Sequence, residues 1–577
     1  MPLGMEKQWQ LNDPNPQTVR TLTERLACSP LMARLLAIRG IDSKIQADRF
    51  LNPSFANLTP PSALADMDIA VQRIHRALQA NEKILLVGDY DADGVTATAA
   101  LTAFLRQCGA RLAYAIPHRI ADGYGMGVDF VQKRVLPAGF SLIVTVDCGS
   151  GNAEAVNLAR RTGVETIVTD HHPIGRLPED ALAVINPSRS DCQARLAHLS
   201  GVGVAFYLVI ALRSHLRKVG FWKHRREPNL RRLCDLVALG TVADVVPLVA
   251  ENRVLTAAGL QQINQGPRPG IAALMRLSTT LDLPVDAEAI AFRLAPRINA
   301  AGRLAHARMA CELLLAESPQ KAAHLARALC RLNRRRQTME NELLQLILDR
   351  ITQRPGWRER AALVVHGNGW HEGILGIVAS RLVRQFHRPA VVIGTRNGQG
   401  KGSARSIDGI DLSMALGQCA DLLDRFGGHP LAAGLSLRAA NVKAFAHRLE
   451  KVVGRMAVDR PVKPALAIDA RLPLDQITVD LMDALERLGP FGQGNPAPVF
   501  MDTQVRIHAC KTVGDRHRRM VLESGAGAGR HTAIQFNVTT DSLAVHRFEK
   551  IAYRPQWNCW NGRKSLQLVI EDTDPQC

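Results

Sequence analysis

Five short apolar runs alternate with helical segments between residues 84 and 186, and this pattern restricts the fold more than any other feature of the chain. The runs occupy residues 84–88, 112–117, 142–147, 165–170 and 181–186. They lack the in-out alternation of a half-exposed strand, so both faces of the sheet should be buried. Strands of this kind separated by helices are typical of a parallel sheet covered on both sides. The sequence therefore predicts an α/β fold.

Changes of pattern divide the 577 residues into five segments. The expected order is an N-terminal helical segment (1–80), a first α/β domain (81–319), a linker helix (320–355), a second α/β domain (356–463) and a small β-barrel (464–577). Residues 320–354 contain no Pro or Gly, which favours one long helix. Short alternating runs near the C-terminus, with Asn561-Gly562 as a hairpin turn signal, favour an OB-like barrel.

The charge balance points to a polyanionic partner. The chain has 72 Lys and Arg against 53 Asp and Glu, which gives a formal net charge of +19. Nucleic acid is the first candidate for such a partner. Alternatively, basic side chains spread over the whole surface would give the same total without any specific partner.

Cysteine usage and hydropathy favour the reducing cytoplasm. The eleven cysteines are scattered singly without a CxxC pair, which argues against a disulfide framework or a thiolate zinc site. No signal peptide is expected at the N-terminus, and no apolar run reaches the roughly 18–20 residues of a transmembrane helix. We therefore expect a cytoplasmic protein without a membrane partner.

Acidic and imidazole side chains follow the predicted strands at their carboxyl ends, where ligands bind in a doubly wound sheet. The clusters are Asp89, Asp91 and Asp93 after the first strand, Asp147 at the end of the third, and Asp170, His171 and His172 after the fourth, with Asp244 following a later helical segment. Any single Asp at a strand end is more often a helix cap than a ligand, and Asp93 before Gly94 fits that description. Three clusters on one edge are harder to explain as caps.

Several carboxylates that share a small volume need positive charge between them to remain ionised. Oxygen-rich sites with one or two imidazoles suit Mn²⁺ or Mg²⁺, and the number of acids is sufficient for two divalent metal ions. A two-ion site stabilises both the attacking and the leaving oxygen of a phosphoryl displacement. In a basic protein, this chemistry indicates phosphodiester hydrolysis.

Eight motifs in order then identify a resemblance. They are DYDADG, TVDCG, TDHH, GTVADVVPL, PRINAAGR (296–303), WHEGILGIVASRL (370–382), GSARS (402–406) and FGGHPLAAG (426–434). Together they resemble the RecJ-type single-strand-specific exonucleases of the DHH phosphoesterase superfamily, over nearly the whole chain. The resemblance implies that residues 81–319 form the DHH catalytic domain and residues 356–463 the DHH-associated substrate-binding domain.

The resemblance also implies roles for individual residues. The implied metal ligands are Asp91, Asp93, Asp147, His171 and Asp244. Asp89 stands near them as a further ligand or an orienting group, and His172 is implied to contact the scissile phosphate. The wider superfamily often has a His four residues before the first ligand Asp, and here Val87 holds that position.

Phosphate binding is expected in the second domain. Gly427 and Gly428 would let backbone amides approach a phosphate closely, with His429 as a further donor. Ser403 and Arg405 would add a hydroxyl and a forked cation. The first domain would line the same cleft with Arg297 and Asn299, whereas Arg303 suits a structural ion pair better.

The function implied by the resemblance is 5′→3′ hydrolysis of single-stranded DNA to 5′-mononucleotides in recombination and DNA repair. Its partners would be single-stranded DNA, a single-strand-binding protein and a repair helicase, and the enzyme would be a cytoplasmic, nucleoid-associated monomer. Two alternatives remain. One is a DHH phosphodiesterase for small substrates, such as oligoribonucleotides or cyclic dinucleotides. The other is a non-catalytic single-strand-binding member of the fold.

Overall fold

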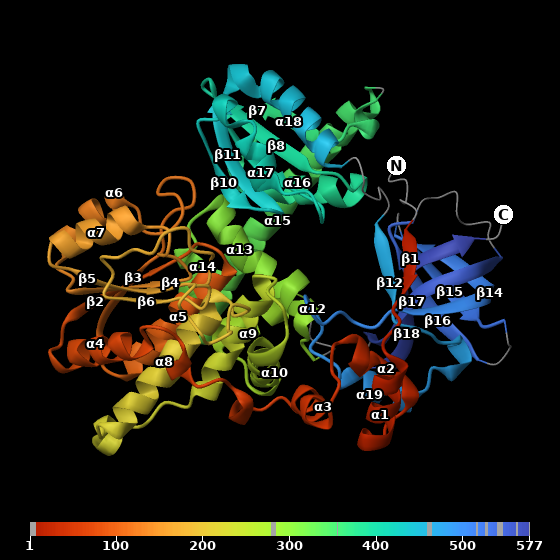
Figure 1. Cartoon of the computed structure of the whole chain (residues 1–577), viewed down its shortest axis with the longest axis horizontal. Helices are drawn as coiled ribbons and strands as arrows, with labels where there is room; N and C mark the ends of the chain where they lie inside the picture. Colours follow the sequence, from red (N-terminus) through yellow and green to blue (C-terminus); the bar gives the residue numbers. More distant parts are fainter. Residues whose placement is uncertain are drawn as a thin grey trace.

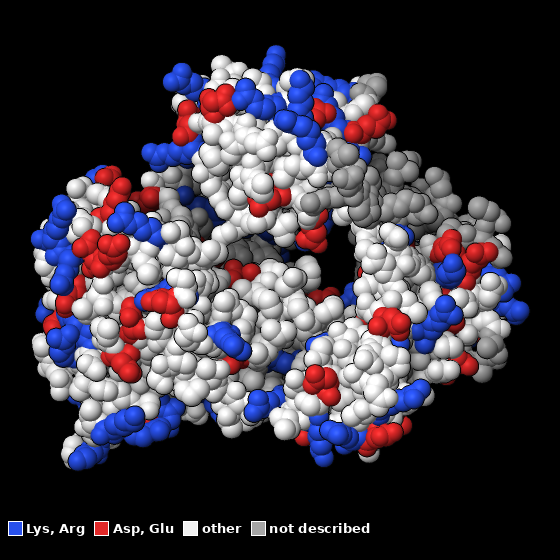
Figure 2. All heavy atoms as spheres, in the orientation of Figure 1, with Lys and Arg blue, Asp and Glu red and all other residues white. Residues whose placement is uncertain are grey.

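The structure is a computed structural model, and it places three bodies around a central opening (Figures 1 and 2). It describes residues 7–278, 284–354, 356–457, 464–514, 517–525, 529–538, 546–560 and 563–575. The first α/β domain is the largest body, the second α/β domain lies above it in Figure 1, and the barrel lies to the right. Within the described ranges, no helix combines the length and apolarity that a membrane span requires.

The first domain contains the predicted parallel sheet. Its strands are ordered β3-β2-β4-β5-β6, with β2 (Lys83–Gly88), β3 (Arg111–Ala115), β4 (Leu142–Val146), β5 (Glu165–Thr169) and β6 (Ala183–Ile185) all parallel. The chain leaves β2 toward β3 on one side and continues with β4 on the other side. The carboxyl ends of β2 and β4 therefore form the topological switch point, where ligands bind in such sheets.

Helices cover both faces of this sheet, as the unbroken apolar strands require. On one face, α4 (Met67–Gln79), α5 (Ala92–Gln107) and α8 (Gly201–Lys218) share one core with side chains of β2 and β4. On the other face, α7 (Ala153–Arg161) packs over the alternate residues of the same strands. Two further helices, α9 (Cys234–Ala243) and α10 (Ala250–Gln265), pack against each other beside α5.

One helix, α15 (Pro319–Thr352), leads from the first domain to the second. The second sheet has the order β10-β11-β9-β8-β7, with β7 (Leu363–Asn368), β8 (Ala390–Arg396), β9 (Gln399–Arg405), β10 (Arg425–His429) and β11 (Ala432–Arg438). Only β7 and β8 are parallel in it. The helix α16 (Glu372–Phe386) covers β8 and β9 on one face, and α18 (Val442–Met456) covers the other. The fold of two α/β domains joined by a long helix is thus confirmed.

The C-terminal strands close into a five-stranded barrel, which confirms the OB-like architecture. The strands are β14 (Phe500–Val513), β15 (His517–Glu523), β16 (Arg530–Phe536), β17 (Arg547–Trp560) and β18 (Arg563–Pro575), and β14 pairs with both β15 and β17. Along the β17–β18 ladder, Trp560 pairs with Arg563. The predicted turn between them, Asn561-Gly562, lies outside the described residues.

The N-terminal segment is helical as predicted, but it also contains a strand that the sequence did not indicate. This strand, β1 (Gln8–Leu11), pairs in parallel with β12 (Ala465–Ile468). The helices α1 (Pro16–Leu26), α2 (Pro30–Ile38) and α3 (Lys44–Leu51) follow. Leu22, Leu35 and Leu36 share one apolar core with the barrel. The two ends of the chain therefore fold as one body (Figure 1).

Candidate metal centre and substrate cleft

Acidic and imidazole clusters that are far apart in the sequence meet at the switch point of the first sheet. Asp89 and Asp91 follow β2, Asp147 follows β4, and His171 comes after β5. Asp244 joins them from the C-terminal end of α9. Three overlapping sets of ligand atoms have all their members within 4.8 Å of one another: Asp89, Asp91 and Asp147; Asp93, His171 and Asp244; Asp147, His171 and His172.

The N-terminal ends of α5 and α8 hold the carboxylates of Asp91 and Asp93, respectively. Asp91 caps α5, where its Oδ1 accepts hydrogen bonds from the N–H groups of Asp93 and Gly94, both at 3.0 Å. The buried Asp93 instead accepts from the first turn of α8, from Gly201 N–H at 2.7 Å and Val202 N–H at 2.9 Å. The cap is therefore Asp91 rather than Asp93, and capping does not prevent either residue from facing the cluster. The positive end of α8 favours the ionised form of Asp93.

Asp147 lies in the left-handed region with φ +61°, a conformation that turns the chain sharply at the end of β4. Its backbone N–H still donates to Thr169 O at 2.9 Å, so the hydrogen bonding between β4 and β5 continues as far as Asp147. Its carboxylate lies against Gly201. A Cβ atom at residue 201 would stand 2.2 Å from Asp147 Oδ1, so only glycine fits there.

Asp170, His171 and His172, the three residues of the DHH triplet, make different contacts. The carboxylate of the buried Asp170 accepts from Ser150 N–H at 3.0 Å, and its Oδ1 pairs with His172 Nδ1 at 2.8 Å. His171 Nε2 points into the cluster, 3.2 Å from Asp147 Oδ1 and 3.6 Å from Asp244 Oδ2. Asp170 thus orients the neighbouring ring, while His171 stands among the carboxylates.

The donor set fits hard divalent cations. Three of the buried polar atoms that have no hydrogen-bond partner among the described residues belong to this cluster: Asp89 Oδ1, Asp147 Oδ1 and His171 Nε2. Leaving such atoms unpaired is costly, and all three face the cluster. Carboxylate oxygens with an imidazole nitrogen are the ligands that Mn²⁺ and Mg²⁺ accept. The cluster therefore has the donor set of a candidate divalent-metal centre.

The electrostatics of the cluster support the same interpretation. Burial and the charge of Asp91 raise the pKa of Asp93 to about 7, and burial and the charge of Asp93 raise that of Asp244 to about 9. Burial and neighbouring carboxylates also hold the pKa of Asp147 well above its usual range. Burial and the adjacent His172 lower the pKa of His171 to about 4, so this ring is neutral at pH 7. Without a cation, the carboxylates retain protons that a metal ion would displace.

The predicted phosphate-binding residues of the second domain lie together on one face of its sheet. Arg405 Nη1 donates to Ser403 Oγ at 3.0 Å. Ser403 pairs with Gly434 in the β9–β11 ladder, and Gly434 pairs with Gly427 of β10. The edge strand β10, which contains Gly427, Gly428 and His429, is exposed. These residues form an exposed surface of glycine backbone beside the side chains of Ser403 and Arg405. We call the surface made by Ser403, Arg405, Gly427, Gly428 and His429 the shelf.

Two arginines of the first domain affect this shelf electrostatically: Arg119, which the sequence did not single out, and Arg303, for which it favoured a structural ion pair. Burial and the charge of Arg119 lower the pKa of Arg405. Burial and the charges of Arg119 and Arg336 lower the pKa of Arg303 to about 10. Arg303 also donates to Gly373 O at 3.1 Å, so it joins α13 (Ala295–Leu304) to α16. Like charges gathered in this way suit an anion between the two domains.

The remaining two predicted residues lie on α13. Asn299 Oδ1 accepts from Ala92 N–H at 2.8 Å, so it holds the DYDADG segment in place. Arg297 donates to the carbonyl of Arg293 one turn earlier, and its Nε has no partner among the described residues. The described contacts therefore connect Asn299, but not Arg297, to the catalytic loop.

A large cavity lies between the first domain and the barrel. Its volume is about 930 Å³, and its lining includes Phe292, Phe491, Trp557, Arg384 and Arg554. Phe292 exposes 70% of its surface. Figure 2 shows the opening that passes between the three bodies. The exposed ring of Phe292 and the guanidinium groups of the lining together suit an unpaired base and its phosphates.

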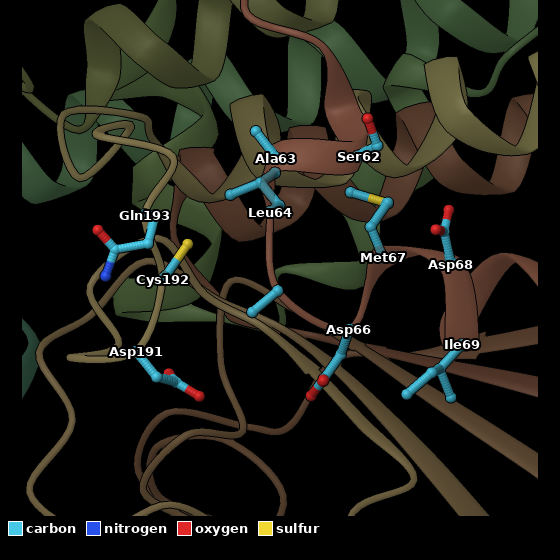
Figure 3. Close-up of a pocket in the computed structure, with 11 residues that line it drawn as sticks. Ser62, Ala63, Leu64, Asp66, Met67, Asp68, Ile69, Asp191, Cys192 and Gln193 are labelled. Carbon is cyan, nitrogen blue, oxygen red and sulfur yellow. The ribbon is translucent and has the colours of Figure 1, made fainter.

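A smaller hollow lies between the N-terminal end of α4 and residues 191–193 (Figure 3). Its volume is about 340 Å³, and Asp66, Asp68 and Asp191 line it. Arg189 pairs with Asp66 Oδ2 and Asp191 Oδ2, both at 2.6 Å. Because one guanidinium neutralises two of the three carboxylates, the hollow has the chemistry of a structural ion pair.

Family models match three parts of the chain. The model of the DHH family, N-terminal domain, covers residues 83–241. The DHHA1 domain model covers residues 360–455, and the RecJ OB domain model covers residues 468–572. These matches fall on the first sheet, the second sheet and the barrel, respectively.

Full-length relatives agree with the family models. The chain is 38% identical to the single-stranded-DNA-specific exonuclease RecJ of Salmonella typhimurium over 559 residues, which covers 95% of this chain and 96% of the relative. It resembles the crystal structure of Thermus thermophilus RecJ in complex with Mn²⁺, with a TM-score of 0.82 and 31% identity over 99% of this chain and 80% of that chain. The corresponding Mg²⁺ complex gives a TM-score of 0.77 with 29% identity, over 98% of this chain and 78% of that chain. The chain therefore belongs to the RecJ family of single-stranded-DNA-specific exonucleases.

Proposed function

We propose that this chain is a divalent-metal-dependent exonuclease that hydrolyses single-stranded DNA in the 5′→3′ direction and releases 5′-mononucleotides. The observation that carries the proposal is the position of His171 Nε2, 3.2 Å from Asp147 and 3.6 Å from Asp244, at the switch point of the sheet. The alternative of a non-catalytic binding protein would not require this buried, mutually repelling set of ligands.

The catalytic work is assigned to residues 81–319. Asp91, Asp93, Asp147, His171 and Asp244 would hold the metal ions, with Asp89 as a further ligand. Two bound divalent cations would supply a hydroxide nucleophile near neutral pH and neutralise charge on the phosphate. His172 would donate from Nε2 to a phosphate oxygen in its imidazolium form. Burial lowers the pKa of His172, but the hydrogen bond from its Nδ1 to Asp170 at 2.8 Å raises that pKa above its usual value and favours this form.

Residues 356–463 would hold the 5′ end of the strand. Ser403, Arg405, Gly427, Gly428 and His429 form the shelf that would bind the terminal phosphate. Arg119 and Arg303 would add positive charge from the facing domain, and Arg297 and Asn299 would line the cleft below. A charge-assisted, bidentate contact from Arg405 suits a phosphate better than a neutral end.

Specificity for single strands would follow from the path to the site. Residues 464–577 would bind the strand through the barrel and through the cavity beside Phe292 and Trp557. Stacking on exposed rings requires unpaired bases. A cavity on this side also favours a long strand over a cyclic dinucleotide or another small substrate.

The cellular role follows the same chemistry. We propose action in DNA recombination and repair, with a single-strand-binding protein and a helicase as partners that supply unpaired DNA. The enzyme would act as a monomer in the cytoplasm, on nucleoid DNA.

Digestion of 5′-labelled and 3′-labelled single strands, with duplex controls, in Mn²⁺ and in Mg²⁺ tests the proposal. A 5′ label should appear at once in mononucleotides, and duplex should resist. Asp147→Asn keeps the shape of the side chain but removes the charge, so hydrolysis should fall at least 10³-fold while strand binding persists. Activity confined to dinucleotides, or metal-dependent hydrolysis that survives Asp147→Asn, would contradict it.

A further inference from the structure

The loop after β3 places Tyr124, a residue with no role assigned above, at the carboxyl edge of the first sheet, where the acidic cluster lies. This loop is seated on the N-terminal end of α7, where Met126 N–H donates to Asn152 Oδ1 at 3.3 Å. Gly125 has φ +68°, and a Cβ atom there would stand 2.4 Å from Asn152 Oδ1. Only a glycine allows this approach, and the approach fixes the position of the preceding residue, Tyr124.

The Tyr124 hydroxyl contacts two catalytic segments at once. Its oxygen lies 3.2 Å from the carbonyl oxygen of Asp147 and 3.1 Å from Nδ1 of His172. The ring also meets the His172 ring edge-on, with centroids 5.6 Å apart and an interplanar angle of 73°. One side chain therefore connects the end of β4 with the segment that follows β5.

The donors and acceptors at this hydroxyl determine its arrangement. A backbone carbonyl only accepts, so the single hydroxyl proton goes to Asp147 O. The oxygen lone pair then accepts from His172 Nδ1–H, which Asp170 Oδ1 also engages at 2.8 Å. With the proton on Nδ1, the Nε2 atom of His172 is the ring nitrogen that remains for a substrate.

We propose that Tyr124 is a positioning residue for hydrolysis, which fixes the ring of His172 through a hydroxyl that the carbonyl of Asp147 holds in place. The proposal rests on the exonuclease function argued above. His172 needs such support because its side chain remains 37% exposed, so Asp170 alone does not restrict both faces of the ring.

Removal of the hydroxyl should affect the rate more than binding. Small misplacements of a catalytic group can cost about 10²-fold in rate. The ligands of the metal ions remain in place without the hydroxyl, and so does the tyrosine ring. We therefore expect kcat of Tyr124→Phe to fall about 10- to 100-fold, with KM for a single strand within about twofold of the wild type.

Tyr207→Phe is the matched control. Tyr207 of α8 is fully buried, and its hydroxyl has no hydrogen-bond partner among the described residues. Its hydroxyl therefore supports no catalytic group, so this variant should retain wild-type kcat. Calorimetric titration with Mn²⁺ and thermal unfolding complete the comparison, and both should match the wild type in Tyr124→Phe.

A double-mutant cycle with His172→Ala shows whether Tyr124 acts through His172. If it does, Tyr124→Phe should slow single-turnover hydrolysis much less in the His172→Ala background than in the wild type. Equal losses in both backgrounds, a wild-type kcat in Tyr124→Phe, or a parallel loss of Mn²⁺ affinity would each overturn the proposal. An inactive wild-type enzyme would instead refute the exonuclease function itself.

Discussion

Arg253 of α10 donates from its Nη1 to the carbonyl oxygen of Leu488 at 2.8 Å, and this bond ties the first domain to the segment that leads into the barrel. The same guanidinium donates to Phe50 O at 2.8 Å and to Arg487 O at 3.2 Å. It also lies 3.7 Å from the centre of the Phe50 ring. A single buried side chain thus joins α10, the N-terminal helices and the barrel.

Arg253→Met should loosen this junction. The substitution leaves three carbonyl groups without their donor, so we expect a loss of about 2–4 kcal/mol in the free energy of unfolding. Thermal unfolding and limited proteolysis between residues 488 and 500 would measure it. The exposed Arg20, changed to Met, is the control, and equal melting temperatures for the two variants would contradict the prediction.

Gly201→Ala should weaken metal binding, although residue 201 is not itself a metal ligand. A new Cβ atom 2.2 Å from Asp147 Oδ1 would force the carboxylate to move. We expect Mn²⁺ affinity, measured by calorimetry, to fall more than about 10-fold, because a displaced ligand loses its coordination geometry. Gly203→Ala, two residues further along α8, meets its nearest neighbour at 3.3 Å and should remain close to the wild type. Similar losses in both variants would indicate a general effect on the helix.

Metal affinity should rise with pH. Asp93 and Asp244, with pKa values of about 7 and about 9, carry protons at neutral pH that a cation must displace. His171, with a pKa of about 4, releases none in this range. Titration with Mn²⁺ from pH 6 to pH 8.5, in buffers of different ionisation enthalpy, should therefore show proton release that declines as the pH rises.

The same pKa shifts affect the stability of the metal-free protein. A carboxyl whose pKa is raised by folding binds more protons in the folded state than in the unfolded state, so stability falls as the pH rises through the shifted values. Metal-free protein should thus melt at a lower temperature at pH 8.5 than at pH 6, and saturating Mn²⁺ should remove the difference. Affinity and stability that are independent of pH would contradict the proposed ionisation states.

Strand affinity should fall steeply with salt. The net charge of +19 is spread over a protein whose catalytic edge is acidic, so the excess positive charge lies elsewhere. For single strands, log K falls by about 0.7 per unit of log salt for each phosphate neutralised, so six contacts give a slope of about −4. Fluorescence anisotropy with Asp147→Asn measures this without hydrolysis.

Two arginines distinguish a binding track from general surface charge. Burial and the charge of Arg335 lower the pKa of His371, so Arg335 of α15 acts on the start of α16 in the second domain. Arg226 is an exposed residue in the segment that follows α8. Arg335→Ala should make the salt slope shallower by about 0.7, whereas Arg226→Ala should leave it unchanged. Equal slopes in both variants would mean that the charge of α15 does not contact the strand.

The sequence predicted the first sheet well because burial on both faces leaves a strong local signal. The run at 165–170, for example, differs from β5 (Glu165–Thr169) by one residue. The placement of Asp89, Asp147 and His171 on one edge followed from strand direction alone, because parallel strands share a carboxyl edge. Their distances did not follow, because they depend on Gly201 and on the turn at Asp147.

Contacts between distant segments were beyond a local pattern. The four residues of β1 carry no periodicity that separates them from a loop, and their partner β12 lies more than 450 residues away. The role of Tyr124 is not visible in the sequence, because its hydroxyl contacts depend on how Gly125 packs against Asn152. Arg119 likewise becomes relevant only once the second domain has placed Arg405 opposite it.

The shared body of the two chain ends has a consequence for synthesis. The helices α1 and α2 are translated well before their apolar partners in the barrel. Domains generally fold as they emerge from the ribosome, so the first domain can form while α1 and α2 still lack their apolar partners. Leu22, Leu35 and Leu36 must then remain unburied through most of translation, a period in which chaperones would protect them. This body can complete its fold only after the barrel strands have been translated and have packed against α1 and α2.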